Sequence, residues 1–307
     1  MRVIRDIADV PSDLNAPVVT IGNFDGVHCG HRQLLDKVHE AARQHRGSTV
    51  VITFRPHPVV VTRPDLGLRL LTSYDQKLAL LEASGIDLVA ELIFDDELRA
   101  WSAERFIQDW LVDGLRVRHV VAGPDSRFGK GREGNAQLLS EWGNRLGFTV
   151  ESVPPVLLDG APVSSSRIRK VLQEAGDVVS AANLLGRPVQ VRGLVVEGER
   201  RGRDIGFPTA NLDLGEVLVP RNGVYAAYAS LQGHRYSAVV NIGVKPTFGT
   251  HARAVEAHLL DYQGNCYGEE IALDFVKRLR DECRFSSVDE LVVQIKTDVQ
   301  TARGLFP

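Results

Sequence analysis

Hydrophobic and polar positions follow two different patterns along this chain of 307 residues, and together they predict two modules. In the first 175 or so residues, short apolar runs predict strands, and stretches with apolar residues every three to four positions predict helices. Expected strands are 17–22, 48–54, 87–94, 117–122 and 148–153, and expected helices are 31–45, 74–84, 102–114, 134–146 and 166–175. This alternation indicates a doubly wound, mostly parallel α/β sheet, in which ligands bind at the carboxyl ends of strands.

The pattern changes past residue 186, where short segments of β character follow one another. The turns between them include 221–223, 232–234 and 263–265. Closely spaced strands and turns predict a small antiparallel β-barrel. We expect the boundary within 183–188, which gives domains 1–185 and 186–307.

A helix is expected to close the chain. Its apolar face comprises Val288, Leu291, Val292, Ile295 and Val299. Ser287 and Glu290 have the spacing of a capping box at its start.

Composition and charge narrow the class of protein. Hydrophobic residues make up 44% and charged residues 24%, which are ordinary globular values. The net charge of −3 argues against a general nucleic-acid or anionic-membrane binder. Three cysteines form no disulfide framework, and neither a signal peptide nor a membrane span is evident. We therefore expect a cytoplasmic protein, and the composition leaves homo-oligomerisation open.

The segment from Thr20 to His31, TIGNFDGVHCGH, carries the first chemical signal. It joins an expected strand to an expected helix through a glycine-containing turn, and the free N–H groups at such a helix start form an anion site. His28 and His31 are three residues apart where the helix opens, so both rings can reach one phosphate. Gly30 between them has no side chain to block that approach.

Two simpler interpretations compete with an anion site. A histidine pair near a helix start is commonly a cap or a surface feature. A zinc site is disfavoured, because two histidines and Cys29 lack a further ligand at finger spacing.

The run resembles the HxGH signature of the nucleotidyltransferase superfamily, and its longer form GxFDGxHxGH is similar to prokaryotic FAD synthetases. Three later segments also resemble that family: TFRPHP at 53–58, GPDSRFGKG at 123–131 and SSSRIR at 164–169. The first and the third have simpler alternatives, a proline-rich surface loop and N-capping of a helix. Gly129, Gly131 and Gly134 also fit a GxGxxG spacing. A dinucleotide fold is disfavoured for the glycines, because they do not directly follow a strand.

The resemblance implies transfer of AMP from ATP to a phosphate, with release of pyrophosphate. It implies catalytic roles for His28, His31 and Arg169; a cation in a helix's first turn opposes the macrodipole and calls for an anion. An already anionic nucleophile needs no general base, so catalysis consists of alignment and charge stabilisation.

The implied nucleotide-binding residues are Gly22, Asn23, Phe24, Asp25, Gly30, His57, Asp125, Ser164, Ser165 and Arg167, with Phe128 at the flavin. Asn23 and Asp25 would either shape the turn or meet the metal–nucleotide. Ser126 stands where the family usually has an aromatic residue. This departure puts in question how well the flavin or the adenine is packed at that position.

A second motif, GFPTAN at 206–211, follows the glycine-bearing basic loop GERRGR at 198–203. Together they resemble the riboflavin kinase motif GxxxGRxLGFPTAN, with Ile205 at the usual leucine. No Walker A loop is present in the segment. Thr209 and Asn211 offer neutral oxygens to Mg²⁺, which often takes few protein ligands; a plain turn is the simpler alternative. Further implied nucleotide-binding residues are Gly198, Arg203, Gly206, Phe207 and Pro208, and implied flavin-binding residues are Tyr225 and Phe285.

Glu256 is the candidate general base, because an alcohol nucleophile benefits from a carboxylate that accepts its proton. Alternation in 254–260 places Glu256 and His258 on one face of an expected strand. A solvated strand face is the simpler alternative, and the resemblance to an E-x-H-x-x-D stretch of riboflavin kinases favours the base.

Across nearly its whole length, then, the chain resembles the prokaryotic bifunctional riboflavin kinase/FMN adenylyltransferase (FAD synthetase) family. The resemblance implies that the C-terminal module makes FMN from riboflavin and Mg-ATP, and that the N-terminal module converts FMN to FAD. Two alternatives stay open: a riboflavin kinase with an impaired adenylyltransferase module, and a non-catalytic flavin-binding regulator.

Overall fold

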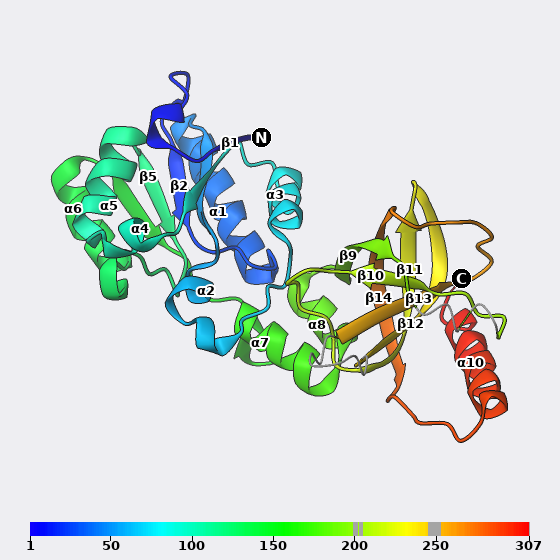
Figure 1. Cartoon of the computed structure of the whole chain (residues 1–307). Helices are drawn as coiled ribbons and strands as arrows, with labels where there is room; N and C mark the ends of the chain where they lie inside the picture. Colours follow the sequence, from blue (N-terminus) through cyan, green and yellow to red (C-terminus); the bar gives the residue numbers. More distant parts are fainter. Residues whose placement is uncertain (199–201, 203–204, 245–252, 307) are drawn as a thin grey trace. The chain divides into compact units, whose positions relative to one another are not determined.

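The structure is a computed structural model that describes residues 1–198, 202, 205–244 and 253–306. The chain forms two compact units (Figure 1). The first comprises Met1–Arg69 and Ser73–Ser164, and the second comprises Leu70–Thr72 and Ser165–Pro307.

Within the described residues, the first unit is built on a six-stranded parallel sheet. Its strands are β1 (Arg2–Ile4), β2 (Val18–Ile21), β3 (Thr49–Arg55), β4 (Leu88–Ile93), β5 (His119–Ala122) and β6 (Thr149–Ser152). They lie in the order β1-β4-β3-β2-β5-β6, so the chain extends the sheet on one side of β2 and then on the other. The sheet is therefore doubly wound, as expected. Ligand crevices in such sheets lie at the carboxyl ends of the strands where the order reverses, which here is beside β2.

Helices cover both faces of this sheet because neighbouring residues of a buried strand point to opposite sides (Figure 1). One core contains Val18 and Val51, and the other contains Val19 and Ile52. The first core lies under α1 (Cys29–His45) and α3 (Tyr74–Ala83), and the second under α5 (Ala103–Phe106), the π-helical segment η3 (Ile107–Gly114) and α6 (Ala136–Leu146).

Shorter elements complete the first unit. They are η1 (Ile7–Asp9), α2 (Pro58–Thr62), η2 (Pro64–Leu66), α4 (Asp96–Ala100), η4 (Lys130–Arg132), β7 (Leu157–Leu158) and β8 (Ala161–Pro162). All five expected strands are confirmed, but the sequence analysis missed β1, a three-residue edge strand that pairs with β4.

In the second unit, helices precede a closed antiparallel barrel. The helices are α7 (Ser165–Lys170), the π-helical segment η5 (Val171–Ala175) and α8 (Val178–Leu185). Helix α8 was not predicted, and its last three residues overlap the segment 183–188 where we expected the boundary. The described barrel strands are β9 (Val189–Val196), β10 (Ala210–Asp213), β11 (Gly223–Leu231), β12 (His234–Val244), β13 (Arg253–Leu259) and β14 (Glu270–Arg280), in the order β10-β13-β12-β11-β14-β9.

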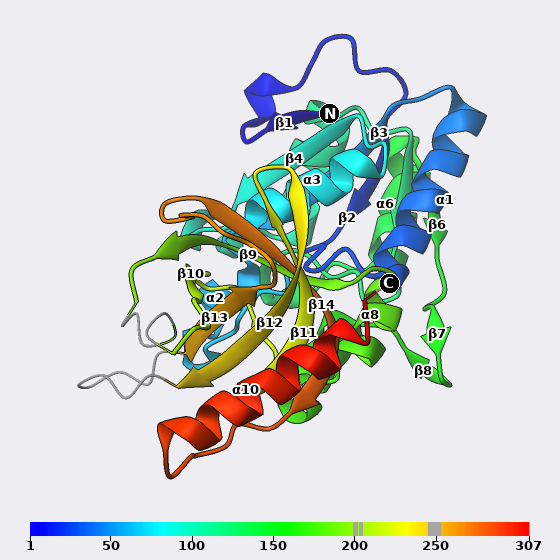
Figure 2. The ribbon, with the colours of Figure 1, turned by 90° about the vertical axis from the view of Figure 1, so that its right-hand side faces the viewer.

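The closing helix α10 (Val288–Arg303) lies against the outside of the barrel (Figure 2). A small core that includes Val224, Val239 and Ala302 joins them. Ser287 caps the helix as expected, because its hydroxyl accepts the Glu290 N–H at 3.2 Å. The Glu290 carboxylate accepts the N–H of Ser286 at 3.0 Å, one residue before the partner of a regular capping box.

Candidate functional sites

The turn between β2 and α1 (residues 22–28, the β2–α1 turn) is a compact piece of backbone at the carboxyl end of β2. Phe24 and Val27 adopt left-handed conformations, with φ of 50° and 37°, and Gly26 has φ of 82°. Left-handed backbone is unfavourable for a bulky residue, so it persists only where the surroundings hold it. The side chains of Phe24 and Val27 are fully buried in the core under α1, and this burial stabilises the turn.

His28 and His31 lie side by side where α1 begins. Their rings are stacked, with centroids 3.7 Å apart and an angle of 13° between the planes. His28 is also the N-cap of α1, because its Nδ1 accepts the His31 N–H at 3.3 Å. A Cβ on Gly30 would lie 3.2 Å from the His28 ring. The capping interpretation is therefore correct for His28, whose ring is fixed against the backbone N–H of His31.

The other polar groups predicted for this turn also have defined places. Asp25 is buried, and Gly22 and Asn23 are partly exposed. A Cβ on Gly22 would lie 3.1 Å from the Phe24 ring, so glycine permits the tight approach of that ring.

The segment predicted to lie beside the site after β3 is more ordered than a surface loop. His57 is 8% exposed and caps α2, with its Nδ1 accepting the Val59 N–H at 3.2 Å. Its own backbone N–H donates to the Tyr74 hydroxyl at 2.9 Å.

The glycine-rich segment after β5 is held by close packing. A Cβ on Gly129 would come within 2.6 Å of the Ala103 backbone, and one on Gly134 within 2.6 Å of the Phe128 ring. Phe128 is buried beside Phe106, and Asp125 is exposed. Both glycines are therefore needed for close packing.

The serine- and arginine-containing segment spans the division between the two units. Ser164 ends the first unit, and Ser165 begins both the second unit and α7. Arg167 and Arg169 on α7 are partly exposed.

Strand register assembles a second candidate site on the barrel. Asn211 on β10 and Asn241 on β12 both lie directly opposite Glu256 on β13. Directly opposed residues share a face and have Cβ atoms roughly 5 Å apart, so these three residues form a polar row. The neighbours Val255 and Ala257 are buried, which confirms the predicted alternation. Sequence analysis did not place Asn241 beside Glu256, because register is not visible in one strand.

The loop before β10 lies against this polar row. A Cβ on Gly198 would lie 2.1 Å from the Asn211 amide nitrogen. His258, next but one to Glu256, contacts the Pro208 carbonyl through Nδ1 at 2.7 Å, and its ring meets the Phe207 ring edge-on at 5.6 Å.

Thr209 in this loop is partly exposed and Gly206 exposed. A Cβ on Gly202 would lie 3.5 Å from the Thr209 hydroxyl oxygen. Arg203, which the resemblance places at the nucleotide, lies outside the described residues.

The two aromatic residues predicted to contact the flavin from the barrel differ in exposure. Tyr225 is 0% exposed and packs inside the barrel against Phe275. Burial raises the pKa of its phenol, whose oxygen accepts the Arg278 Nε–H at 3.3 Å and donates to the Arg221 carbonyl. Phe285 is partly exposed.

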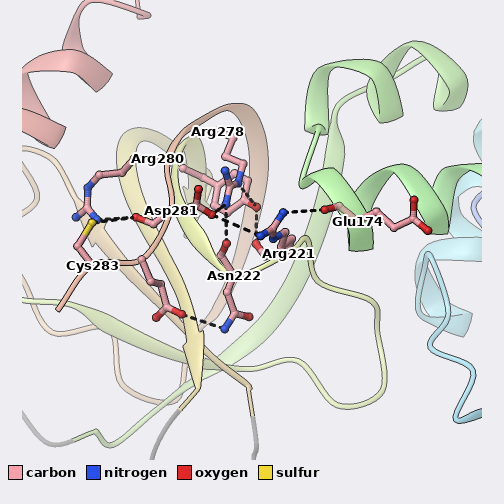
Figure 3. A network of polar contacts seen from close by, with 9 residues as sticks. Glu174, Arg221, Asn222, Arg278, Arg280, Asp281 and Cys283 are labelled. Atoms are coloured by element: carbon pink, nitrogen blue, oxygen red, sulfur yellow. Dashed lines mark hydrogen bonds and ion pairs between the residues drawn. The ribbon is translucent and has the colours of Figure 1, made fainter.

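Figure 3 shows the polar network that surrounds the ends of β11 and β14. Arg278 donates to the Asn222 carbonyl at 2.9 Å and to the Asp281 carboxylate at 2.6 Å. Arg221 reaches the Glu174 carbonyl at 3.0 Å. This network holds the first residues after β14, which lead toward Phe285.

Comparisons with known proteins agree with this two-unit architecture. The family model for FAD synthetase matches residues 10–167, and that for riboflavin kinase matches residues 185–306. A bifunctional riboflavin kinase/FMN adenylyltransferase from Escherichia coli K12 is 39% identical over 100% of this chain and 97% of its own length. One from Pseudomonas fluorescens is 38% identical, over 99% and 98%.

Among solved structures, one described as a macrolide-efflux protein from Streptococcus pneumoniae is 32% identical, with a TM-score of 0.89 and 98% of both chains covered. The described part of the present chain contains no helix with the length and apolar character of a membrane span.

A parallel α/β unit matched by a FAD synthetase model, followed by a barrel matched by a riboflavin kinase model, defines a two-module transferase. The chain belongs to the family of bacterial bifunctional riboflavin kinase/FMN adenylyltransferases.

Proposed function

We propose that the first unit joins FMN to the AMP part of ATP at the β2–α1 turn. An oxygen of the FMN phosphate attacks the α-phosphorus of ATP, the bond to the β-phosphate oxygen breaks, and FAD and pyrophosphate leave. The stacked pair of His28 and His31 at the start of α1 is the observation that carries this proposal. Their ring N–H groups would stabilise charge on the α-phosphate, together with the positive end of the α1 macrodipole.

The other predicted residues have supporting roles in this proposal. Gly22 and Gly30 leave room for the phosphates, and Arg169 and Arg167 supply positive charge. Asn23, Phe24, Asp25, His57, Asp125, Ser164 and Ser165 complete the nucleotide site, with Phe128 behind the flavin.

On the barrel, the 5′-hydroxyl oxygen of riboflavin would attack the γ-phosphorus of ATP. Glu256 would accept the proton that this hydroxyl group loses. FMN and ADP are the products. The polar row supports this assignment, since the strand register holds Asn211 and Asn241 on either side of Glu256. Gly198, Arg203, Gly206, Phe207 and Pro208 would bind the nucleotide. Phe285 would contact the flavin, and the buried Tyr225 would support that contact from inside the barrel.

The donor set beside Glu256 suits Mg²⁺ bound together with ATP. The described residues contain no group of three or more His, Cys, Asp or Glu arranged for a resident metal. Thr209 and Asn211 offer the neutral oxygens that a nucleotide-bound Mg²⁺ accepts, and Gly198 leaves space against the Asn211 amide. When bound, Mg²⁺ supplies positive charge to the phosphates.

The cellular setting of the proposal is the cytoplasm, with ATP, riboflavin and FMN as small-molecule partners and no nucleic acid or membrane. Free cysteines at positions 29, 266 and 283 support a reducing compartment.

Chromatography of flavins, after incubation of the protein with riboflavin, ATP and Mg²⁺, tests both halves. FMN followed by FAD is expected from the wild type. His31→Ala should make FMN but little FAD, and Glu256→Gln should lose FMN formation by roughly 10²- to 10⁴-fold while converting supplied FMN to FAD.

The outcomes separate the alternatives. Equal loss of both products in His31→Ala would contradict two separate sites, and full phosphorylation by Glu256→Gln would remove Glu256 as the base. FMN alone from the wild type would indicate an impaired adenylyltransferase, with Ser126→Phe as the first reversion. Bound flavin without any product would favour a regulator.

A further inference from the structure

Lys77 is a buried cation that the motif analysis did not identify. It lies on α3 and is 4% exposed, on the helix face that also buries Gln76 and Leu81. Lysine is almost never buried without partners, because an ammonium leaves water at a high cost. The position of Lys77 in the core therefore calls for an explanation.

The partners of Lys77 lead directly to the β2–α1 turn. Its Nζ donates to the Thr53 hydroxyl at 3.0 Å and to the Phe54 carbonyl at 3.3 Å. The Thr53 hydroxyl in turn donates to the Asn23 carbonyl at 3.2 Å. An ammonium can only donate, so it leaves the hydroxyl proton free to point at Asn23. A three-group chain thus joins α3, β3 and the turn.

The link reaches the turn next to one of its two left-handed non-glycine positions. Asn23 precedes Phe24, whose φ is 50°. Phe24 also lies 4.9 Å, ring centroid to ring centroid, from His31. The orientation of the Asn23 peptide therefore affects the position of the Phe24 ring, which packs against the proposed catalytic residue His31.

Charged groups from each neighbouring element face Lys77. The carboxylates of Glu91 on β4 and Asp25 in the turn attract its charge, and Arg55 at the end of β3 opposes it. Tyr74 on α3 places its ring 5.2 Å from Nζ. Burial is the largest influence, and it lowers the pKa of Lys77 to about 8.

Glu91 belongs to the same cluster through the sheet register, since it is the parallel-strand partner of Thr53. Its buried carboxylate accepts two bonds from Arg5, at 3.1 and 3.2 Å, and lies 3.9 Å from Arg55. The Glu91 carboxylate thus lies in one cluster of charged groups with Lys77, Arg5 and Arg55.

We propose that Lys77 is a positioning residue for adenylyl transfer, holding the β2–α1 turn in its reactive form through Thr53 and supplying positive charge behind it. The inference rests on the proposed placement of that reaction at the turn. Because the ammonium loses its proton near pH 8, FAD formation should decline between about pH 7 and 9.5, while the phosphates of FMN and ATP, with second pKa values near 6, stay ionised throughout.

The test measures FMN adenylylation from pH 7 to 9.5 in the wild type, Lys77→Met and Lys37→Met. Lys77→Met should lower kcat by about 10- to 100-fold at pH 7, the range for a lost hydrogen bond to a charged group, and flatten the alkaline decline. Lys37 is a partly exposed lysine paired with Glu40, and its replacement should leave rate and profile unchanged.

If Lys77→Met unfolds the first unit, a second pair of variants tests the positioning role instead. Thr53→Val removes the hydroxyl that joins Lys77 to Asn23, and Thr53→Ser keeps it. The valine variant should lose kcat about tenfold and the serine variant should stay within about twofold of the wild type.

Two results overturn the inference: a wild-type rate that is level up to pH 9.5, or equal activity of the valine and serine variants. Failure of the proposed function is distinguishable, because His31→Ala would then leave FAD formation intact. If His31→Ala loses FAD formation as expected, and the Lys77 and Thr53 variants keep the wild-type rate and pH profile, only the positioning role of Lys77 is rejected.

Discussion

The two candidate sites are assembled in opposite ways. In the first unit, the stacked histidines and the turn that precedes them lie within ten residues, 22–31, on one strand–turn–helix segment. On the barrel, Asn211, Asn241 and Glu256 come from three strands and meet only through register. A local segment specifies the first arrangement, whereas correct pairing of distant strands is required for the second.

The difference teaches where each site is vulnerable. A one-residue slip of a strand moves its side chains to the opposite face, so the polar row depends on the whole barrel. The β2–α1 turn depends on the burial of Phe24 and Val27, on the cap made by His28 and, in our proposal, on the link to Lys77 through Thr53. Three substitutions probe this contrast.

The largest expected effect comes from Asp298→Ala, which should destabilise the barrel. Asp298 is buried and receives bonds from Arg280 at 2.9 and 2.7 Å and from Gln294 at 2.9 Å. Its removal leaves a partly buried guanidinium without that carboxylate, at a cost of about 3–5 kcal/mol of unfolding free energy. On heating, Asp298→Ala should lose riboflavin phosphorylation at a temperature roughly 10 °C below that of the wild type. Its FAD formation from supplied FMN should be lost at the same temperature as in the wild type.

Asp289→Ala is the matched control. Asp289 is an exposed acid in the first turn of the same helix, so its loss should cost at most about 1 kcal/mol. Parallel loss of both activities on heating Asp298→Ala would show that the units do not unfold independently.

Gly198→Ala should have the second-largest effect. The new methyl would lie 2.1 Å from the Asn211 amide nitrogen, and displacing that flexible side chain is the simplest relief. We expect riboflavin phosphorylation to fall about 10- to 100-fold, as for loss of one well-placed polar group, with little change in melting temperature.

Gly304→Ala serves as the control for this glycine. Gly304 has φ of −70°, and a Cβ there would have no neighbour closer than 3.5 Å. Wild-type kinetics of Gly198→Ala would mean that the position of Asn211 is unimportant for the kinase.

Gly30→Ala should have the smallest effect and completes the comparison. Its methyl would lie 3.2 Å from the His28 ring, a contact that a shift of a few tenths of an ångström relieves. Because alanine is the better helix former by about 1 kcal/mol, stability should not fall, while the displaced imidazole should lower FAD formation only a few-fold.

Steady-state rates of both reactions on the same preparation check this prediction, with riboflavin phosphorylation as the internal control. If Gly30→Ala lowered FAD formation by as large a factor as Gly198→Ala lowers riboflavin phosphorylation, the local site would be as sensitive to an added methyl as the barrel site. The contrast between the two sites would then not hold.

Much of the secondary structure could be predicted, because strand and helix periodicities are local properties. The five long strands of the first unit and its main helices were found from apolar spacing alone. Edge strand β1 and helix α8 were missed; three residues are too few to show a period, and the end of α8 overlaps the segment where we expected a boundary. The capping of α10 was predicted to the residue on the serine side and was one residue off on the glutamate side.

The sequence by itself determined the two modules, the contiguous histidine segment and the alternation around Glu256, since each is encoded by neighbours along the chain. Only the tertiary structure decided that Tyr225 lies inside the barrel, that Asn241 joins the polar row, and that Lys77 is buried under the turn. Burial and register arise from packing between residues distant in sequence, and no spacing within one segment specifies which lysine will lie in the core.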